Sequence, residues 1–147
     1  MHELPRQLSA EELAELFEGR TRFVERLSGL DDPLGRARSV ARELSEEEKV
    51  EALNAHPAIG AKGLSERSAA EQGTSDEPVV LTELAYQNQV YEEKFGFRFV
   101  VFVNRRPKRE ILDVLRARLE RGRGEELNTG VDELVSIAED RWRSRSR

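Results

Sequence analysis

An internal histidine placed directly before a proline is the first candidate for chemistry in this sequence. The chain has two histidines, His2 near its first residue and His56, which precedes Pro57. An imidazole with a pKa near neutrality can act as a general acid or base. Because Pro57 disfavours the α conformation for the residue before it, His56 is expected just past a helix end, on a fixed bend. Such a bend would aim its side chain, although a surface or helix-capping histidine is the commoner outcome.

Two further clusters carry polar side chains that could contact a ligand. The first, SAAEQ, runs from Ser68 to Gln72, and its Ser68 and Glu71 also fit a helix capping box. The second runs from Asn88 to Val103 and is rich in phenylalanine. Its aromatic residues could form core or a ligand cage, and Asn88 could simply bond a loop carbonyl. For both clusters, the residues alone leave the structural and the functional interpretation open.

The composition excludes several kinds of site. The chain has no cysteine, which excludes disulfides and thiolate metal ligands. A single internal histidine provides no HxxxH or HxH pair, so a metal site is poorly supported. The sequence contains no glycine-rich phosphate loop after a strand, no serine elbow and no cysteine nucleophile.

Charge and hydropathy limit the partners and the compartment. The net charge of -5 argues against general nucleic-acid binding. No apolar run approaches the ~20 residues that a bilayer-spanning helix requires. Residues 1–13 lack the pattern of a signal peptide, and the absence of cysteine suits a reducing cytosol. We therefore expect a cytoplasmic protein that binds neither nucleic acid nor membrane, with residues 143–147 as a basic, solvated tail.

The elements that would position these residues are predicted to be helices of one domain spanning residues 1–147. Capping boxes at Ser9 and Ser45, and an Asp32 N-cap before Pro33, mark three helix starts. Helical spacing of apolar residues indicates three more helices, over 81–95, over 107–122 and from about 125. Residues 59–78 are rich in Gly, Ser, Thr and Asp and are expected to form a loop with one short helical turn.

The stretch FRFVVFV, residues 97–103, resembles a strand but has no strand-like partner elsewhere in the chain. A single buried strand cannot form a sheet, so we expect an extended or partly helical buried segment here. The predicted fold class is all-α. The expected architecture is a compact, single-domain bundle of several helices with an irregular buried segment near residues 97–103.

Four motifs in order, HPAIG, SAAEQ, NQVYEEKFGFRFVVFV and ELVSIAEDRW, closely resemble the OHCU decarboxylase family. OHCU is 2-oxo-4-hydroxy-4-carboxy-5-ureidoimidazoline, which lies between urate and allantoin. The resemblance covers the chain from the first predicted helix to Trp142. It implies an all-helical, often homodimeric carboxy-lyase that converts OHCU to (S)-allantoin by acid–base chemistry, with no metal and no organic cofactor.

The resemblance also implies the site residues. It assigns catalysis to His56 and Glu71. It assigns substrate contacts to Pro57, Ser68, Glu71, Gln72, the backbone of Phe99, Val100, Val101, Phe102 and Val103, and Arg141, whose guanidinium offers a fork for a carboxylate.

The chain departs from the family pattern at Arg98, inside FGFxFV, and at Arg105, where a glycine is common. Two other interpretations stay open. The protein could be a different small-molecule lyase or hydrolase that uses the same His/Glu pair. It could also be a non-catalytic helical module whose basic tail docks on an acidic partner.

Overall fold

The computed structural model describes residues 7–57 and 78–145. In these ranges the regular elements are α-helices joined by turns and irregular segments, which confirms the all-α prediction. The helices are α1 (Ala10–Phe17), α2 (Arg22–Leu27), α3 (Pro33–Glu43), α4 (Glu46–Ala55), α6 (Pro78–Phe95), α7 (Lys108–Leu119) and α8 (Arg123–Arg145).

The predicted helix starts are confirmed at three positions. At α1 and α4, Ser9 and Ser45 form complete capping boxes with Glu12 and Glu48. Each serine hydroxyl accepts from the N–H three residues ahead, and each glutamate accepts from the serine N–H. Asp32 accepts from the N–H of Gly35 and begins α3, with Pro33 at the first turn. These caps fix where α1, α3 and α4 begin.

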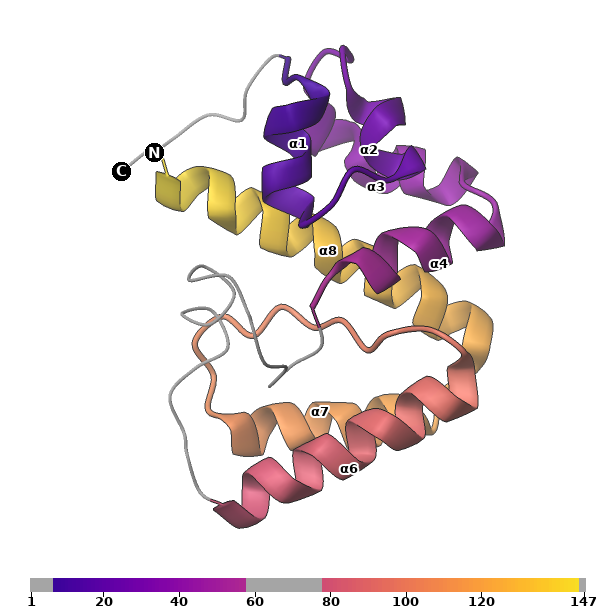
Figure 1. Cartoon of the computed structure of the whole chain (residues 1–147), viewed down its shortest axis with the longest axis vertical. Coiled ribbons are helices and arrows are strands. Elements are labelled where there is room, and N and C mark those ends of the chain that lie inside the picture. The colour runs from indigo at the N-terminus through magenta and orange to yellow at the C-terminus, as the bar shows by residue number, and fades with distance from the viewer. Residues whose placement is uncertain (1–6, 58–77, 146–147) are drawn as a thin grey trace.

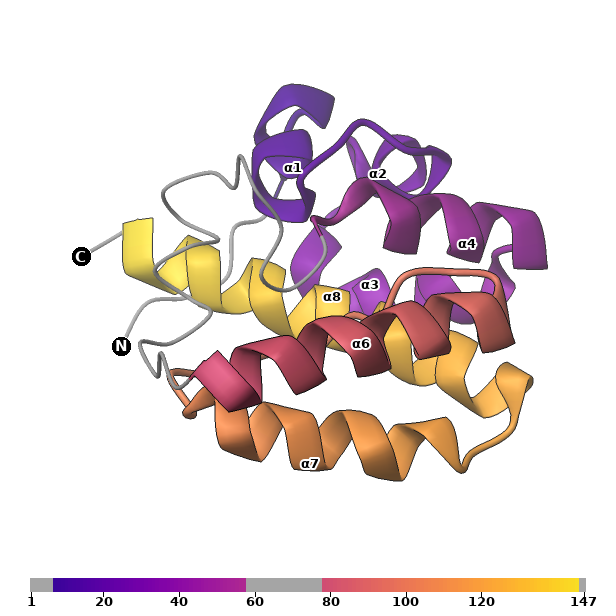
Figure 2. The same ribbon diagram turned by 60° about the horizontal axis from the view of Figure 1, so that its bottom comes forward.

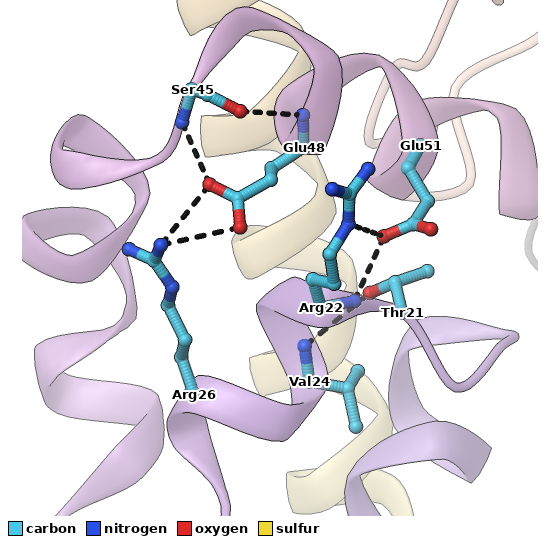
Figure 3. Close-up of polar contacts among 7 residues, drawn as sticks. All are labelled: Thr21, Arg22, Val24, Arg26, Ser45, Glu48 and Glu51. Carbon is cyan, nitrogen blue, oxygen red and sulfur yellow. Dashed lines mark hydrogen bonds and ion pairs between the residues drawn. The ribbon is translucent and has the colours of Figure 1, made fainter.

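The short helix α2 was not predicted, because six residues are too few to show helical periodicity. Thr21 begins it by accepting from the N–H of Val24 at 3.3 Å. Figure 3 shows how α2 is tied to α4. The N–H of Arg22 donates to Glu51 at 2.8 Å, and Arg26 Nη2 donates to both carboxylate oxygens of Glu48 at 3.2 Å.

The longest helix, α8, runs through the molecule and separates two groups of helices (Figure 1). On one side α8 contacts α1, α3 and α4, and α2 joins these helices to one another. On the other side lie α6 and α7, which pack together (Figure 2). The approach of α8 to α4 depends on Gly130, because a Cβ there would lie 2.9 Å from a methyl carbon of Leu53. The core continues through both groups.

An extended segment, residues 98–103, crosses between the two groups of helices. Figure 1 shows α6 and α7 running in the same direction, so the chain must return along α6 before α7 begins. An 18-residue helix is about 27 Å long. About a dozen residues would cover only about 18 Å as a helix but about 40 Å when fully extended, so this connection cannot be helical and follows a largely extended path. Phe97, Phe99, Val100, Val101 and Val103 are buried along this path. This confirms the predicted irregular buried segment and explains its shape.

No helix within the described ranges is both long enough and apolar enough to cross a membrane.

Candidate functional site

His56 lies at the C-cap of α4 in an extended conformation, with φ -80° and ψ 138°. Its N–H donates to the carbonyl of Leu53 at 3.2 Å and closes the last turn of the helix. The predicted effect of Pro57 on His56 is therefore confirmed. The His56 side chain is buried, and Pro57 beside it is half-buried.

The imidazole of His56 is held neutral by its surroundings. Burial, the largest cause, and the positive charges of Arg141 and Arg98 together lower its pKa from 6.5 to about 4, against the opposing charge of Glu18. Within the described part of the chain, the buried Nδ1 has no hydrogen-bond partner. The expected pKa near neutrality was therefore wrong for the ligand-free protein, because the sequence does not show that the ring is buried beside two guanidinium groups.

Arg141 reaches this region from α8 and is buried. Its Nη1 donates to the carbonyl of Leu16 at 2.9 Å, and its Nη2 lies 3.2 Å from the carboxylate of Glu18. The guanidinium therefore anchors the end of α1 as well as placing positive charge near His56. Its predicted role as a fork for a substrate carboxylate stays a prediction.

Glu18, which sequence analysis missed, is brought to the site by a close approach of two chain segments. It is the C-cap of α1 and has a left-handed backbone, with φ 65°. The next residue, Gly19, packs on Ala55, so that a Cβ at Gly19 would lie 2.9 Å from the Ala55 Cβ. Only a glycine permits this contact without a shift. The sequence did not indicate that Glu18 would lie at the site, because Ala55, which Gly19 contacts, is distant along the chain.

The segment from Phe99 to Val103 is fixed largely by hydrogen bonds from side chains to its backbone. The Val100 carbonyl accepts from Arg118 Nη1 at 2.7 Å, and the Phe102 N–H donates to Glu133 at 3.2 Å. Arg106 donates to the carbonyls of Phe102 and Val103, at 2.6 and 3.0 Å. These contacts hold the backbone without a neighbouring strand. The Phe102 N–H is already used, so the predicted substrate contacts of this segment would come from its other backbone groups.

A buried polar network lies behind the segment. Glu126 Oε1 accepts from Arg118 Nε at 2.6 Å and from the Tyr91 hydroxyl at 2.7 Å. The Arg118 guanidinium also stacks 4.7 Å from the centre of the Phe99 ring. The charge of Arg118 is paired with that of Glu126, so the network can be buried without leaving an isolated charge, while Arg118 Nη2 has no hydrogen-bond partner among the described residues. It joins α6, α7 and α8 to the segment.

Arg98 connects His56 with the segment. The Arg98 N–H donates to Asn54 Oδ1 at 3.0 Å, and its Nη1 donates to the carbonyls of His56 at 2.8 Å and Asn54 at 3.2 Å. The structure thus brings together His56, Pro57, the segment and, through charge, Arg141. Three other predicted site residues, Ser68, Glu71 and Gln72, lie outside the described residues.

Asn88, singled out from the sequence, is buried in α6, and its Oδ1 has no partner among the described residues. In residues 7–57 and 78–145, no three His, Asp or Glu side chains gather in a way that could hold a metal ion.

Comparisons with known proteins agree on one family. The sequence model of the family described as OHCU decarboxylase matches residues 2–143. A 2-oxo-4-hydroxy-4-carboxy-5-ureidoimidazoline decarboxylase from Haloferax volcanii is 29% identical over 132 residues, which cover 86% of this chain and 78% of that protein. The uric acid degradation bifunctional protein TTL from Arabidopsis thaliana is 34% identical over 100 residues, covering 61% of this chain but only 31% of that protein.

Solved structures agree as well. A crystal structure of OHCU decarboxylase in the presence of (S)-allantoin aligns with a TM-score of 0.74 and 26% identity, over 88% of this chain and 94% of that one. A crystal structure of (S)-allantoin synthase has the same fold, with a TM-score of 0.68 and 20% identity, over 92% of this chain and 48% of that one.

Proposed function

The chain belongs to the OHCU decarboxylase family, and we propose that it decarboxylates OHCU to (S)-allantoin with His56 as the group that moves the proton. The enzyme is a carboxy-lyase of urate degradation. The observation that carries the role of His56 is a buried, neutral imidazole at the end of α4, whose Nδ1 has no hydrogen-bond partner among the described residues.

The substrate defines what the protein must supply. In OHCU one ring carbon carries both the hydroxyl and the carboxylate, and the next carbon carries the ureido group and is doubly bonded to a ring nitrogen. When the carboxylate leaves as carbon dioxide, its electron pair forms a double bond between these two carbons, and the ring nitrogen takes up a proton. The product is an enol, so the ring is its own electron acceptor and the step needs no cofactor.

Allantoin then forms when the enol loses its hydroxyl proton and gains a proton on the ureido-bearing carbon. A neutral imidazole can perform both transfers, because it can accept the first proton and deliver it to the neighbouring carbon. The lowered pKa of His56 keeps the ring in the accepting form at neutral pH. Delivery from one fixed direction would give a single enantiomer.

The remaining site residues are proposed to hold the ring against His56. Backbone groups between Phe99 and Val103, together with Pro57, would line one side. Ser68, Glu71 and Gln72 would bond the ring and ureido groups, with Glu71 also assisting proton transfer. Arg141 would provide positive charge for the substrate carboxylate while remaining bonded to Leu16 and Glu18.

The activity is tested by generating OHCU from urate in situ and following its decay and the circular dichroism of the product. Spontaneous decay can protonate either face and should yield racemic allantoin. We expect the protein to accelerate decay and to yield one enantiomer, also after exhaustive chelation. Racemic product at the buffer rate would contradict the proposal.

We further propose that the protein is a cytoplasmic homodimer, as the family resemblance implies. Val79 and Tyr86, exposed on α6 and seven residues apart, are candidates for the dimer contact because this spacing places them on one helix face. Light scattering after size-exclusion chromatography should give twice the chain mass, and Tyr86→Glu should shift the protein toward the monomer.

A further inference from the structure

Arg98 makes three hydrogen bonds to the end of α4, across more than forty residues of sequence. One comes from its main-chain N–H to the Asn54 side chain, and two come from Nη1 to the carbonyls of Asn54 and His56. The last carbonyls of a helix have no partner within the helix, so a positive donor placed there both satisfies and stabilises them. Arg98 therefore caps α4 from outside the helix.

The main chain of Arg98 is itself held in place. Its neighbours Phe97 and Phe99 are buried on either side, and both rings contact the Tyr91 ring, with centroid distances of 6.0 and 5.1 Å. Arg118, stacked on Phe99, also bonds the next carbonyl at Val100. Because the main chain of Arg98 is fixed on both sides, its hydrogen bonds fix the position of the residues that accept them at the end of α4.

We propose that Arg98 is a positioning residue of the decarboxylase site, which sets the distance between His56 and the segment from Phe99 to Val103. It does so by donating hydrogen bonds from Nη1 to the His56 carbonyl and from its main-chain N–H to the side-chain oxygen of Asn54. This role rests on the proposed function, because it concerns the geometry between the proton-transfer group and the backbone that faces the substrate.

Two features separate this role from simple helix capping. One of the accepting carbonyls belongs to His56 itself, so loss of this hydrogen bond allows the residue that carries the imidazole to move. The guanidinium also contributes charge at His56, together with Arg141 from α8 and against Glu18 from the end of α1. Loss of Arg98 should therefore change both the placement and the protonation of the imidazole.

The test uses three variants and one matched control in the full chain. Arg98→Met keeps the apolar stem but removes every guanidinium bond. Arg98→Lys restores the charge and one donor, and Asn54→Ala removes only the side-chain acceptor of the Arg98 N–H. The control is Arg123→Met. Arg123 donates to the Phe95 carbonyl at 2.8 Å, stacks on Phe97 and pairs with Glu46, and it is not among the charges that shift the pKa of His56.

A misplacement of about 1 Å can cost about 100-fold in rate, so Arg98→Met should lower kcat by about 10- to 100-fold. KM should change by less than about threefold, since the substrate contacts themselves remain. The enantiomeric excess of the product should fall, and Arg98→Lys should recover part of both losses. Arg123→Met should lose stability but retain kcat and enantiomeric excess.

A second readout does not depend on activity. Nuclear magnetic resonance of histidine-labelled protein, with His2→Gln used for assignment, follows the titration of His56 directly. Its pKa should rise in Arg98→Met, stay near the wild-type value in Arg98→Lys and be unchanged in Arg123→Met. An unchanged His56 titration in Arg98→Met would overturn the inference whether or not the wild type acts on OHCU.

The inference also fails if folded Arg98→Met retains wild-type kcat and enantiomeric excess, or if Arg123→Met loses as much kcat as Arg98→Met. If Arg98→Met does not fold, the inference is tested with Arg98→Lys and Asn54→Ala. Wild-type kcat in both of these variants would overturn the inference. A wild-type protein that is inactive toward OHCU would instead refute the proposed function. The NMR titration of His56 would still test whether Arg98 acts on His56.

Discussion

The Nη1 of Arg141, near the end of α8, donates to the carbonyl of Leu16, near the end of α1, at 2.9 Å. The two residues are 125 positions apart. The same guanidinium pairs with Glu18, whose charge acts on His56. Arg141 thus joins the last helix to the first, and its charge helps to set the pKa of His56.

We expect Arg141→Ala to destabilise the protein by about 2–3 kcal/mol, because it removes a fully buried side chain, its hydrogen bond to Leu16 and its ion pair with the half-buried Glu18. It should also weaken substrate binding more than it lowers the enantiomeric excess. Urea unfolding measures the first effect and KM the second. Arg143→Ala, at an exposed position two residues later, is the control and should change neither. Equal stability of the two variants would show that the Arg141 contacts are dispensable.

His56→Asn should nearly abolish turnover while the fold remains intact. General acid–base groups typically contribute about 10²- to 10⁴-fold, and the substitution leaves the helix end and Pro57 in place. The slow spontaneous reaction should then dominate, so the product should become racemic. Product circular dichroism and far-ultraviolet circular dichroism together measure chemistry and fold. A wild-type rate in this variant would remove His56 from the mechanism.

The lowered pKa of His56 predicts a specific dependence of stability on pH. The unfolded chain binds the histidine proton near pH 6.5, whereas the folded protein binds it only near pH 4. Protonation therefore favours unfolding, and stability falls as the pH decreases between these values, by up to about 3 kcal/mol. The difference in unfolding free energy between wild type and His56→Gln isolates this effect from other groups. That difference should be constant above pH 6.5 and should change below it.

The same pKa predicts that kcat/KM stays flat from neutral pH down to about pH 5 and declines only near pH 4, where the free enzyme protonates. An acid limb near pH 6.5 would indicate that His56 is exposed in solution.

Glu126 should be far more important for stability than its neighbour Glu125. Glu126→Gln leaves the buried Arg118 guanidinium without its charge partner and should cost about 3 kcal/mol or more. Glu125→Gln removes an exposed pair with Arg121, and such pairs are worth at most about 1 kcal/mol. Thermal unfolding of both variants checks the contrast. Equal losses would show that the buried network has little energetic weight.

Arg105→Gly should stabilise the protein. Arg105 is exposed and has φ 62°, a left-handed conformation that costs a residue with a side chain about 1–2 kcal/mol. Glycine removes this cost but adds conformational freedom to the unfolded chain, so the net gain should be about 0.5–1 kcal/mol. Arg109→Gly, at an exposed position in the first turn of α7, should not stabilise the protein, because glycine is a poorer helix former than arginine.

The sequence determined the local features of this protein. Ser9 and Ser45 begin their helices through contacts within three residues, and Pro57 sets the backbone of His56 through a direct steric effect. The unpaired apolar run at 97–103 had to be buried and could not form a sheet. The motifs around His56, Asn88 and Arg141 were sufficient to indicate the family. Each of these inferences needs only neighbouring residues or a match to a known pattern.

Only the tertiary structure decided the environment of the site. The charge of Glu18 acts on His56 because Gly19 packs on Ala55 and brings the end of α1 to the end of α4. Arg98 bonds the His56 carbonyl from a segment that must return along α6. Burial beside Arg141 then lowers the pKa of His56, whereas the sequence indicated an ordinary value. These effects depend on distances between residues far apart in the chain, and such distances are set by packing and loop path, which short-range sequence patterns do not encode.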